Sequence, residues 1–317
     1  MLGIRPMELL MRVAALAGIV AIFFIFAFVF MKAAPVISHS GLGLVSKSGF
    51  DAQVSEAFYA PADEPMYVFG MLGLLLGTTL TTLISLAVAG FFSIGAAISI
   101  CELAPRAVAS PLIAVVRLMA SIPSVVFGLI GAMLVVPFVE RVFVTVDMQI
   151  EYLAFFQISG RNLLTSVIVL TFMIAPTVIT LSTDALRAVP DIYRETGHAF
   201  GMSRFRVVWR ILLPAARPGI TAGFLLGAGR GVGEAIAVSM VCGGVGKIPS
   251  LAHGFAALLT PVLPLSAAII NKSEAMSVPA VESALFACGA LLLVLGTLFS
   301  LAARLIVRRT GGVGNAF

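Results

Sequence analysis

Charged residues are scarce in this sequence. Asp, Glu, Lys and Arg make up 11% of the 317 residues, whereas hydrophobic residues make up 60%. Soluble domains carry about 25% charged residues, and a soluble core of this length could not cover so much apolar surface. The composition therefore excludes a soluble globular protein and indicates an all-α polytopic membrane protein. The net charge of +5 does not predict a nucleic-acid partner, because the basic residues cluster at the ends of apolar segments.

Two signatures of bound chemistry are also missing. The three cysteines, Cys101, Cys242 and Cys288, show no CxxC spacing and no companion metal ligands, so we expect small buried side chains and no metal or cofactor. No GxxxxGK[ST] motif occurs, so any ATP would be hydrolysed by another subunit. An intramembrane hydrolase is disfavoured, because His198 and His253 lie outside the apolar segments. We therefore expect no enzyme activity in the chain itself.

Six apolar segments are long enough to cross a membrane, which takes about 20 residues at ~1.5 Å of rise each. Only helices satisfy the backbone of an isolated segment in lipid. The first segment is too long for the core of a signal peptide, and no good cleavage site follows it. The predicted spans are Val13–Met31, Met71–Ile100, Leu112–Val139, Leu163–Thr183, Gly219–Cys242 and Ala284–Val307.

Basic residues predict the orientation of these spans. With both termini inside, the inner set is the larger one: Arg5, Arg12, Arg106, Arg117, Arg187, Arg194, Arg204, Arg206, Arg210, Arg217, Arg304, Arg308 and Arg309, against Lys32, Lys47, Arg141, Arg161, Lys247 and Lys272 outside. The expected layout is a cytoplasmic N-terminus (1–12), the first span (13–31), an extracytoplasmic connection (32–70), a core of five spans (71–309) that includes a cytoplasmic loop (184–218), and a cytoplasmic tail (310–317).

Phe255–Ile270 is an alternative seventh span. It is shorter than a span, contains Pro261 and Pro264, and would place Arg308 and Arg309 outside. We therefore expect an interfacial or re-entrant outer segment.

Two prolines fall inside predicted spans, Pro123 in the third and Pro176 in the fourth. Each removes a helical hydrogen bond and is expected to kink its helix. The hydroxyls of Ser121, Ser124 and Thr177 are placed to satisfy freed backbone groups. This arrangement is either purely structural or part of a substrate path, because broken helices with hydroxyls line such paths.

The polar loop between the fourth and fifth spans predicts two helices. Asp191 is the expected N-cap of the first helix, and Gly201 ends it. The second helix is expected over Ser203–Leu213, capped by Ser203, before Pro214 and Pro218 return the chain to the membrane.

An apolar stripe is predicted on the second helix of this loop, formed by Phe205, Val208, Trp209 and Leu212. A stripe at helical spacing is suited to docking on a partner or on the underside of the bundle. The alternative is a basic amphipathic loop that rests on anionic lipid.

The same loop resembles the EAA loop of ABC importer permeases, whose pattern is E-A-A, three residues, Gly, nine residues and I-x-L-P. The matching residues are Glu195, Gly201, Ile211, Leu213 and Pro214. Thr196 and Gly197 replace the two alanines, and Gly197 is expected to weaken the first helix by up to ~1 kcal/mol. The resemblance implies that Ala188–Pro214 docks in a groove of a cytoplasmic ATPase and transmits its motion.

The resemblance extends over about residues 70–304. The stretches FGMLGLLLGTTLTT, ISICELAPR, SIPSVVFGL, VPDIYRETGHAFG and GRGVGEAIAVSMVCG look like the C-type permease of phosphate (Pst) importers. The A-type permease usually continues with Thr-Ala-Pro after the Gly-Glu of the fifth span, whereas Glu234 is followed here by Ala-Ile-Ala-Val.

The resemblance implies a type I ABC importer permease fold in a bacterial or archaeal cytoplasmic membrane. It also implies the partners: a second, A-type permease, two ATP-binding subunits, an external phosphate-binding protein, phosphate itself and the surrounding membrane lipid.

The fifth predicted span carries one Arg and one Glu, Arg230 and Glu234. At i,i+4 they would share a helix face. Arg230 lies thirteen residues past Arg217, or ~20 Å up a helix, where a lone Arg costs at least ~2.5–3.5 kcal/mol. In one interpretation the two side chains form a neutral tie inside the bundle. In the other, Arg230 binds a phosphate in transit, because guanidinium matches phosphate oxygens bidentately, and Glu234 holds Arg230 and keeps the attraction weak enough for release. The resemblance favours this second interpretation.

Two other functions stay open. The substrate could be another oxyanion, namely sulfate, molybdate or phosphonate. The chain could also be an ion-coupled secondary transporter in which Glu234 carries a proton, although such a transporter would not need the EAA-like loop.

Overall fold

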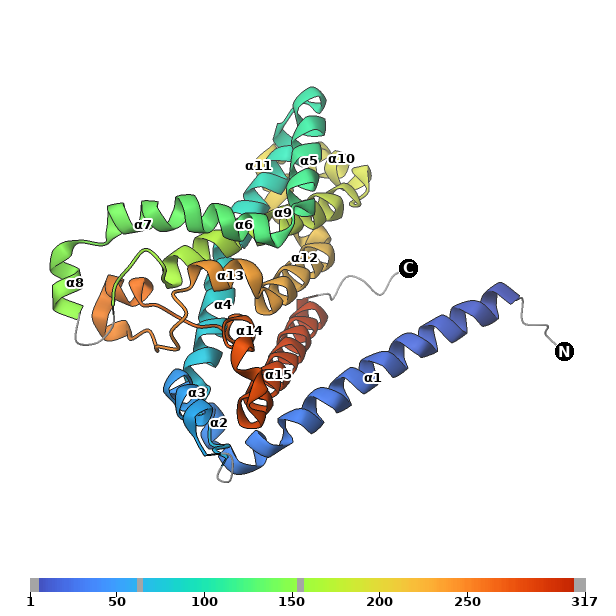
Figure 1. Cartoon of the computed structure of the whole chain (residues 1–317). Helices are drawn as coiled ribbons and strands as arrows, with labels where there is room; N and C mark the ends of the chain where they lie inside the picture. Colours follow the sequence, from blue (N-terminus) through green and yellow to red (C-terminus); the bar gives the residue numbers. More distant parts are fainter. Residues whose placement is uncertain (1–5, 62–64, 153–156, 311–317) are drawn as a thin grey trace.

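The computed structural model describes residues 6–61, 65–152 and 157–310, and within these ranges the chain is mostly helical. Figure 1 shows the helices in space. In chain order they are α1 (Pro6–Ser40), α2 (Gly43–Ser46), α3 (Phe50–Tyr59), α4 (Leu72–Ile98), η1 (Ser99–Leu103), α5 (Arg106–Ser121), α6 (Ser124–Ile130), η2 (Gly131–Val135), α7 (Val136–Phe143), α8 (Val146–Tyr152), α9 (Leu163–Arg187), α10 (Asp191–Ala199), α11 (Arg204–Val207), η3 (Val208–Leu212), α12 (Leu213–Gly233), α13 (Ile236–Val241), η4 (Leu251–Leu259), α14 (Leu265–Asn271), η5 (Ser273–Ser277) and α15 (Pro279–Thr310). The predicted cytoplasmic tail lies outside these ranges from residue 311 onward.

Six helices in the described chain are long and apolar enough to cross a membrane, as the sequence predicts. They are Met7–Ser40, Leu72–Leu103, Ser124–Phe143, Leu163–Arg187, Arg204–Gly233 and Pro279–Ala302. An even number of crossings places both ends of the chain on the same side. The protein is therefore an all-α polytopic membrane protein with six spans.

The predicted third span, Leu112–Val139, is wrong at its start. Ile122 and Pro123 both adopt extended backbone angles, so α5 ends at Ser121 and the spanning helix begins at Ser124. Proline has no N–H, and it disfavours the helical conformation of the residue before it. The kink expected at Pro123 is therefore a complete break between α5 and α6.

The predicted fifth span, Gly219–Cys242, is wrong at both ends. The helix begins far earlier, at Arg204, and α12 ends at Gly233 because Glu234 is extended. The chain then resumes as the short helix α13. The first span also extends beyond its prediction, since α1 continues past Met31 to Ser40.

A polar seam joins α4 to α9 along the core. Ser85, Ser93 and Cys101 donate to backbone carbonyls of α9 that lie 82 residues later in each case, at Val167, Ala175 and Thr183. Ser85 and Ser93 lie in α4, and Cys101 lies in η1, which continues α4. Residues eight apart belong to the same i±4n row of side chains, and such rows pack against a neighbouring helix. Hydrogen bonds of this kind in membranes contribute about 0.6 kcal/mol each. The seam therefore helps to hold α4 and α9 together.

Ion pairs fix the opposite end of the bundle, at the outer side of the predicted topology. The Lys32 ammonium lies 2.9 Å from Glu282 Oε1 and joins α1 to α15. Asp51 at the start of α3 lies 2.9 Å from Lys272 Nζ and accepts a hydrogen bond from the Gly246 N–H. These contacts attach the predicted outer connection to the segment before the last span.

Phe255–Ile270 does not form a seventh span. Its residues belong to η4, an extended stretch through the two prolines, and α14. Leu259, Val262 and Leu263 are fully buried in the bundle. The segment enters the core as short elements, and none of the six helices long enough to span a membrane includes it. The prediction that it is not a span is confirmed.

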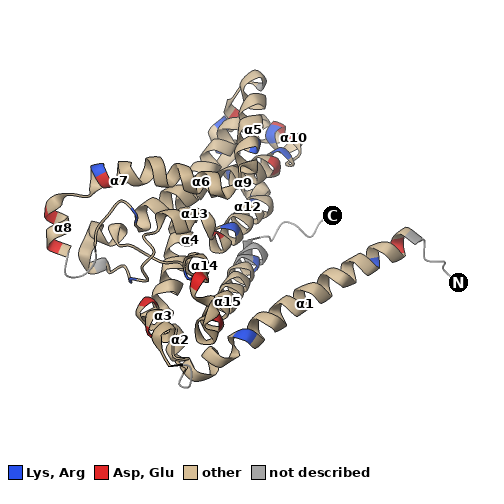
Figure 2. Cartoon of the chain, in the orientation of Figure 1, with Lys and Arg blue, Asp and Glu red and all other residues tan. Residues whose placement is uncertain are grey.

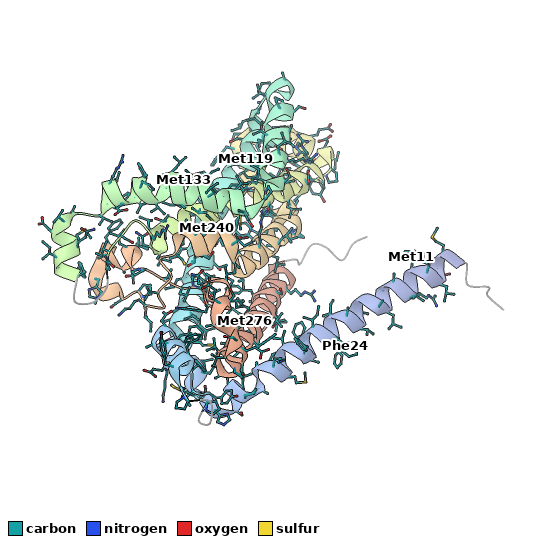
Figure 3. All side chains as sticks on the ribbon, viewed as in Figure 1. Met11, Phe24, Met119, Met133, Met240 and Met276 are labelled. Carbon is teal, nitrogen blue, oxygen red and sulfur yellow. The ribbon has the colours of Figure 1, made fainter. Side chains whose placement is uncertain are left out.

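Much of α1 lies apart from the other helices. Its N-terminal two-thirds project away from the bundle (Figure 1), and many apolar side chains there are exposed, among them Met11 (66%) and Phe24 (65%) (Figure 3). An apolar helix surface of this kind requires lipid or another membrane subunit as its neighbour.

Candidate substrate and coupling sites

The loop between α9 and α12 forms a helix, a sharp turn and a second helix. Gly201 has φ +72°, a left-handed angle that glycine adopts without strain, and it ends the first helix as predicted. The Ser203 hydroxyl accepts from the Arg206 N–H and caps the second helix, also as predicted. The prediction for Asp191 is wrong: Pro190 occupies the N-cap position, and Asp191 is the first helical residue.

The second helix of the loop does not end at Leu213. A π-helical turn, η3, lies just before Pro214, and the Leu213 N–H donates to Val208 O across it. Proline normally breaks a helix because it lacks an N–H and clashes with the carbonyl four residues earlier. The wider turn changes that spacing, so α11, η3 and α12 form one helix from Arg204 into the membrane.

The predicted apolar stripe divides between two surroundings. Val208 and Leu212 are buried against the bundle, whereas Phe205 and Trp209 are exposed, with ring centroids 5.8 Å apart. The stripe therefore docks on the bundle through two of its members and leaves two aromatic rings at the surface.

Gly197 allows the two helices of the loop to approach closely. A Cβ at this position would lie 2.8 Å from Val207 Cγ2 and 3.0 Å from Ile211 Cδ1. The glycine is buried in this contact. The departure from alanine therefore has a packing reason that the sequence pattern alone does not show.

α10 also carries a part-buried ion pair that sequence reasoning missed. Arg194 donates through Nε and Nη2 to Glu102 Oε1, at 3.2 and 3.0 Å, and Glu102 lies in the π-helical turn that ends α4. The same guanidinium donates to the backbone carbonyls of Leu186 and Val189 and to Asp191 Oδ1. Arg194 thus fastens α10 to the ends of both α4 and α9. The signal in the sequence was Glu102, a carboxylate at the predicted cytoplasmic end of a span.

Arg230 lies in the last turn of α12, part-buried against α9. Its Nη1 donates to Thr177 Oγ1 at 3.3 Å, so the structure brings together two of the predicted pathway residues. A guanidinium has five N–H donors. Among the residues that the structure describes, the bond to Thr177 is the only hydrogen bond of Arg230. Most of its donor capacity therefore remains for another acceptor.

Glu234 does not share a helix face with Arg230. It lies beyond the end of α12, is 9% exposed, and its Oε1 accepts from the Ala237 N–H in the first turn of α13. Among the described residues, no oxygen of Glu234 lies within 4.0 Å of an Arg230 nitrogen. The predicted i,i+4 geometry is wrong because the helix breaks at Glu234. The carboxylate stabilises the α13 N-terminus instead.

The comparisons with known proteins agree with this architecture. The model of the family described as "Binding-protein-dependent transport system inner membrane component" matches residues 92–312. The chain belongs to this family. It is therefore a multi-pass inner-membrane permease subunit that works with a substrate-binding protein and an ATPase.

Several relatives carry names that state a substrate. The chain is 36% identical to phosphate transport system permease protein PstC 1 of Mycobacterium tuberculosis (76% of this chain, 73% of the relative) and 31% identical to PstC of Mesorhizobium japonicum (84% and 80%). It is 33% identical to the probable ABC transporter permease protein YqgH of Bacillus subtilis (78% and 75%).

Solved structures show the fold. A bacterial alginate ABC transporter chain matches with a TM-score of 0.57 at 14% identity, over 97% of this chain and 96% of that one. The MetNI methionine ABC transporter matches with a TM-score of 0.52 at 20% identity, over 76% and 97%. The ABC importer permease fold predicted from the sequence is confirmed.

The other EAA-loop residues of this permease lie on and beside α10. Glu195 is exposed, and Ile211 borders a groove of about 430 Å³ together with Ile192, Tyr193, Thr196, Gly197, Phe200 and Met202. Ile192 and Phe200 are 61% and 81% exposed. This apolar side of α10 faces away from Arg194, so it is the face available to a docked subunit.

The remaining predicted pathway residues lie at the break between α5 and α6. The Ser121 hydroxyl donates to Leu118 O at 2.7 Å and satisfies a carbonyl of the broken helix, as expected. Ser124 begins α6. Within the described chain neither serine is hydrogen bonded to Arg230, so their place in the pathway stays a prediction. Among all the residues that the structure describes, no three His, Cys, Asp or Glu side chains are grouped so that they could hold a metal ion.

Proposed function

We propose that this permease is the C-type subunit of an ATP-driven importer of inorganic phosphate. Arg230 carries the proposal: a guanidinium at membrane depth, hydrogen bonded to Thr177 and not paired to Glu234 within the described chain. Two relatives named PstC, with more than 30% identity over three-quarters of the chain, support phosphate as the substrate.

Phosphate passes Arg230 between the outer and inner faces of the complex. The guanidinium offers bidentate hydrogen bonds to the phosphate oxygens, and the Thr177 hydroxyl holds it in place. A path needs sites that bind strongly enough for entry and weakly enough for exit. Glu234 contributes by stabilising the break between α12 and α13, which positions the last turn of α12.

ATP-driven motion enters through α10. Two ATPase subunits dock on the apolar face of α10 and on the corresponding helix of an A-type partner permease. Arg194 transmits the displacement to Glu102 and the end of α4, and the seam carries it along α9 to Thr177. A phosphate-binding protein delivers the substrate at the outer face formed by α3 and the segments tied to it.

The test is uptake of labelled phosphate by the complete importer in proteoliposomes, with ATP inside and outside in separate trials. Uptake that requires ATP on the ATPase side and is inhibited by unlabelled phosphate supports the proposal. Stronger inhibition by sulfate, molybdate or a phosphonate would assign another oxyanion. Uptake driven by a proton gradient without the ATPase would assign a secondary transporter.

A further inference from the structure

A cavity of about 560 Å³ lies between α5 and the C-terminal end of α9. Its lining residues are Ala109, Ser110, Ile113, Ala114, Arg117 and Arg187. Two guanidinium groups and a hydroxyl supply the hydrogen-bond donors that an oxyanion requires. In Figure 2, basic and acidic segments lie together at this end of the molecule, near α5 and α10.

A polar face of α9 leads from Arg230 to this cavity. Thr177, Thr180, Asp184 and Arg187 recur at three- and four-residue spacing on one continuous helix, so they share a face. Arg187 lies ten residues beyond Thr177, about 15 Å along the helix axis. The face thus begins at the hydrogen-bond partner of Arg230 and ends in the cavity.

The side of α5 that lines the cavity also carries hydrogen-bond donors, Ser110 and Arg117. Ser110, Ala114 and Arg117 follow at four- and three-residue spacing and line the cavity together. Arg117 Nη2 lies 3.3 Å from Asp184 Oδ1, and the two side chains are 57% and 49% exposed. Solvent-exposed ion pairs are weak, so Arg117 can exchange Asp184 for an anion. One carboxylate beside two guanidinium groups leaves the site positively charged.

We propose that this cavity is a second oxyanion site, which receives phosphate after Arg230 and releases it to the cytoplasm. Arg187 and Arg117 bind the phosphate oxygens, Ser110 donates a further hydrogen bond, and Asp184 competes for Arg117 to keep the affinity low. The proposal rests on the phosphate import proposed above, and it adds a site on the exit side of the path.

The test measures protection of a thiol at Ser110 in the complete importer. The background carries Cys101→Ser, because Cys101 is only half-buried and lies near Arg187, whereas Cys242 and Cys288 are buried. A charged thiol reagent is added from the ATPase side to the Ser110→Cys variant, with increasing inorganic phosphate. We expect phosphate to slow the labelling. Arg187→Gln should raise the half-protecting phosphate concentration about ten-fold, since a charge-assisted contact is lost.

Two variants make the measurement specific. Arg12→Gln is the matched control, because Arg12 is an exposed arginine paired with Glu8 on α1, away from the cavity; it should leave protection unchanged. Asp184→Asn should lower the half-protecting concentration, because it removes the competitor of the anion. If the half-protecting phosphate concentration of the Ser110→Cys variant is the same with and without Arg187→Gln, the proposal is overturned.

A second experiment measures import by the complex that keeps Ser110. It distinguishes failure of the proposed exit site from failure of phosphate as the substrate. If the wild-type complex imports phosphate, Arg117→Gln/Arg187→Gln should lower the maximal import rate about ten-fold without changing the KM for external phosphate. An unchanged import rate, or absent thiol protection, contradicts the exit site alone. If the wild-type complex imports sulfate and not phosphate, the phosphate assignment fails. Protection by sulfate that requires Arg187 then supports the exit site, and its absence overturns it.

Discussion

At the scale of single residues, Arg230 and Glu234 make separate contacts. Arg230 donates to Thr177, whereas Glu234 accepts from the Ala237 N–H beyond the helix break. The sequence shows both residues and their spacing. It does not show that the helix ends between them, because Gly231 and Gly233 are compatible with a helix interior or a helix end.

This separation predicts the behaviour of Glu234 variants. Glu234→Gln keeps an acceptor oxygen for Ala237 and should retain most of the phosphate uptake. Glu234→Ala loses the hydrogen bond at the α13 N-terminus, which contributes about 0.5–2 kcal/mol in comparable caps, and should lower both the thermal stability and the uptake. Thermal unfolding of the detergent-solubilised complex and uptake by proteoliposomes measure the two effects. A Glu234→Gln variant as impaired as Arg230→Gln would show that the negative charge itself is required.

At the scale of elements, α10 has one exposed apolar face and another face held against the bundle. Ile192, Thr196 and Phe200 belong to the exposed face, and Arg194 belongs to the inner one. The family pattern indicates the docking function of the helix. It does not indicate which carboxylate receives Arg194, since Glu102 is 92 residues away in the sequence.

Because Arg194 on the inner face of α10 pairs with Glu102, we expect Glu102→Gln to weaken the coupling between ATP hydrolysis and transport. The amide cannot form the ion pair with Arg194, so motion of α10 should reach α4 less efficiently. We expect phosphate uptake to fall several-fold while ATP hydrolysis by the assembled complex persists. Asp191→Asn is the control, because the Asp191 side chain is 85% exposed although it also accepts from Arg194. If both variants lower uptake equally, the Glu102 ion pair has no special part in coupling.

Gly197 gives a prediction that opposes the family pattern. Gly197→Ala restores the residue that the EAA pattern contains, yet its Cβ would lie 2.8 Å from Val207 and 3.0 Å from Ile211. Overpacking of this kind costs about 1–3 kcal/mol. We therefore expect weaker co-purification of the ATPase with Gly197→Ala, with Val207→Ala/Gly197→Ala restoring it. Unchanged co-purification in the single variant would mean that the loop adjusts freely.

At the scale of the whole molecule, apolar length predicts the number of spans but not their ends. Six spans follow from hydropathy, and Gly201 and Ser203 end and begin the loop helices as predicted. The errors lie at Pro123, Pro214 and Glu234, where a helix breaks or continues according to tertiary packing and to π-helical turns. Contacts between distant segments, such as the seam between α4 and α9, have no signal in one sequence because a buried serine resembles any other small residue.

The outer ends of the bundle show the same limit. The sequence predicts an extracytoplasmic connection over residues 32–70, and the structure ties it to later segments through Asp51 with Lys272 and Lys32 with Glu282. These pairs join residues more than 200 positions apart. They position α3 beside the buried segment before the last span, where a delivered substrate would enter.

The most direct test of the account is phosphate uptake by the complete importer carrying Arg230→Gln. Assembly of all subunits and ATP hydrolysis are measured in the same proteoliposomes, with Arg12→Gln as the control arginine. The account predicts intact assembly and uptake at least about ten-fold below the unsubstituted complex, because a charge-assisted contact with the substrate is lost. Uptake at the unsubstituted rate, or full recovery in Arg230→Gln/Glu234→Gln, would contradict a role for Arg230 in the phosphate path.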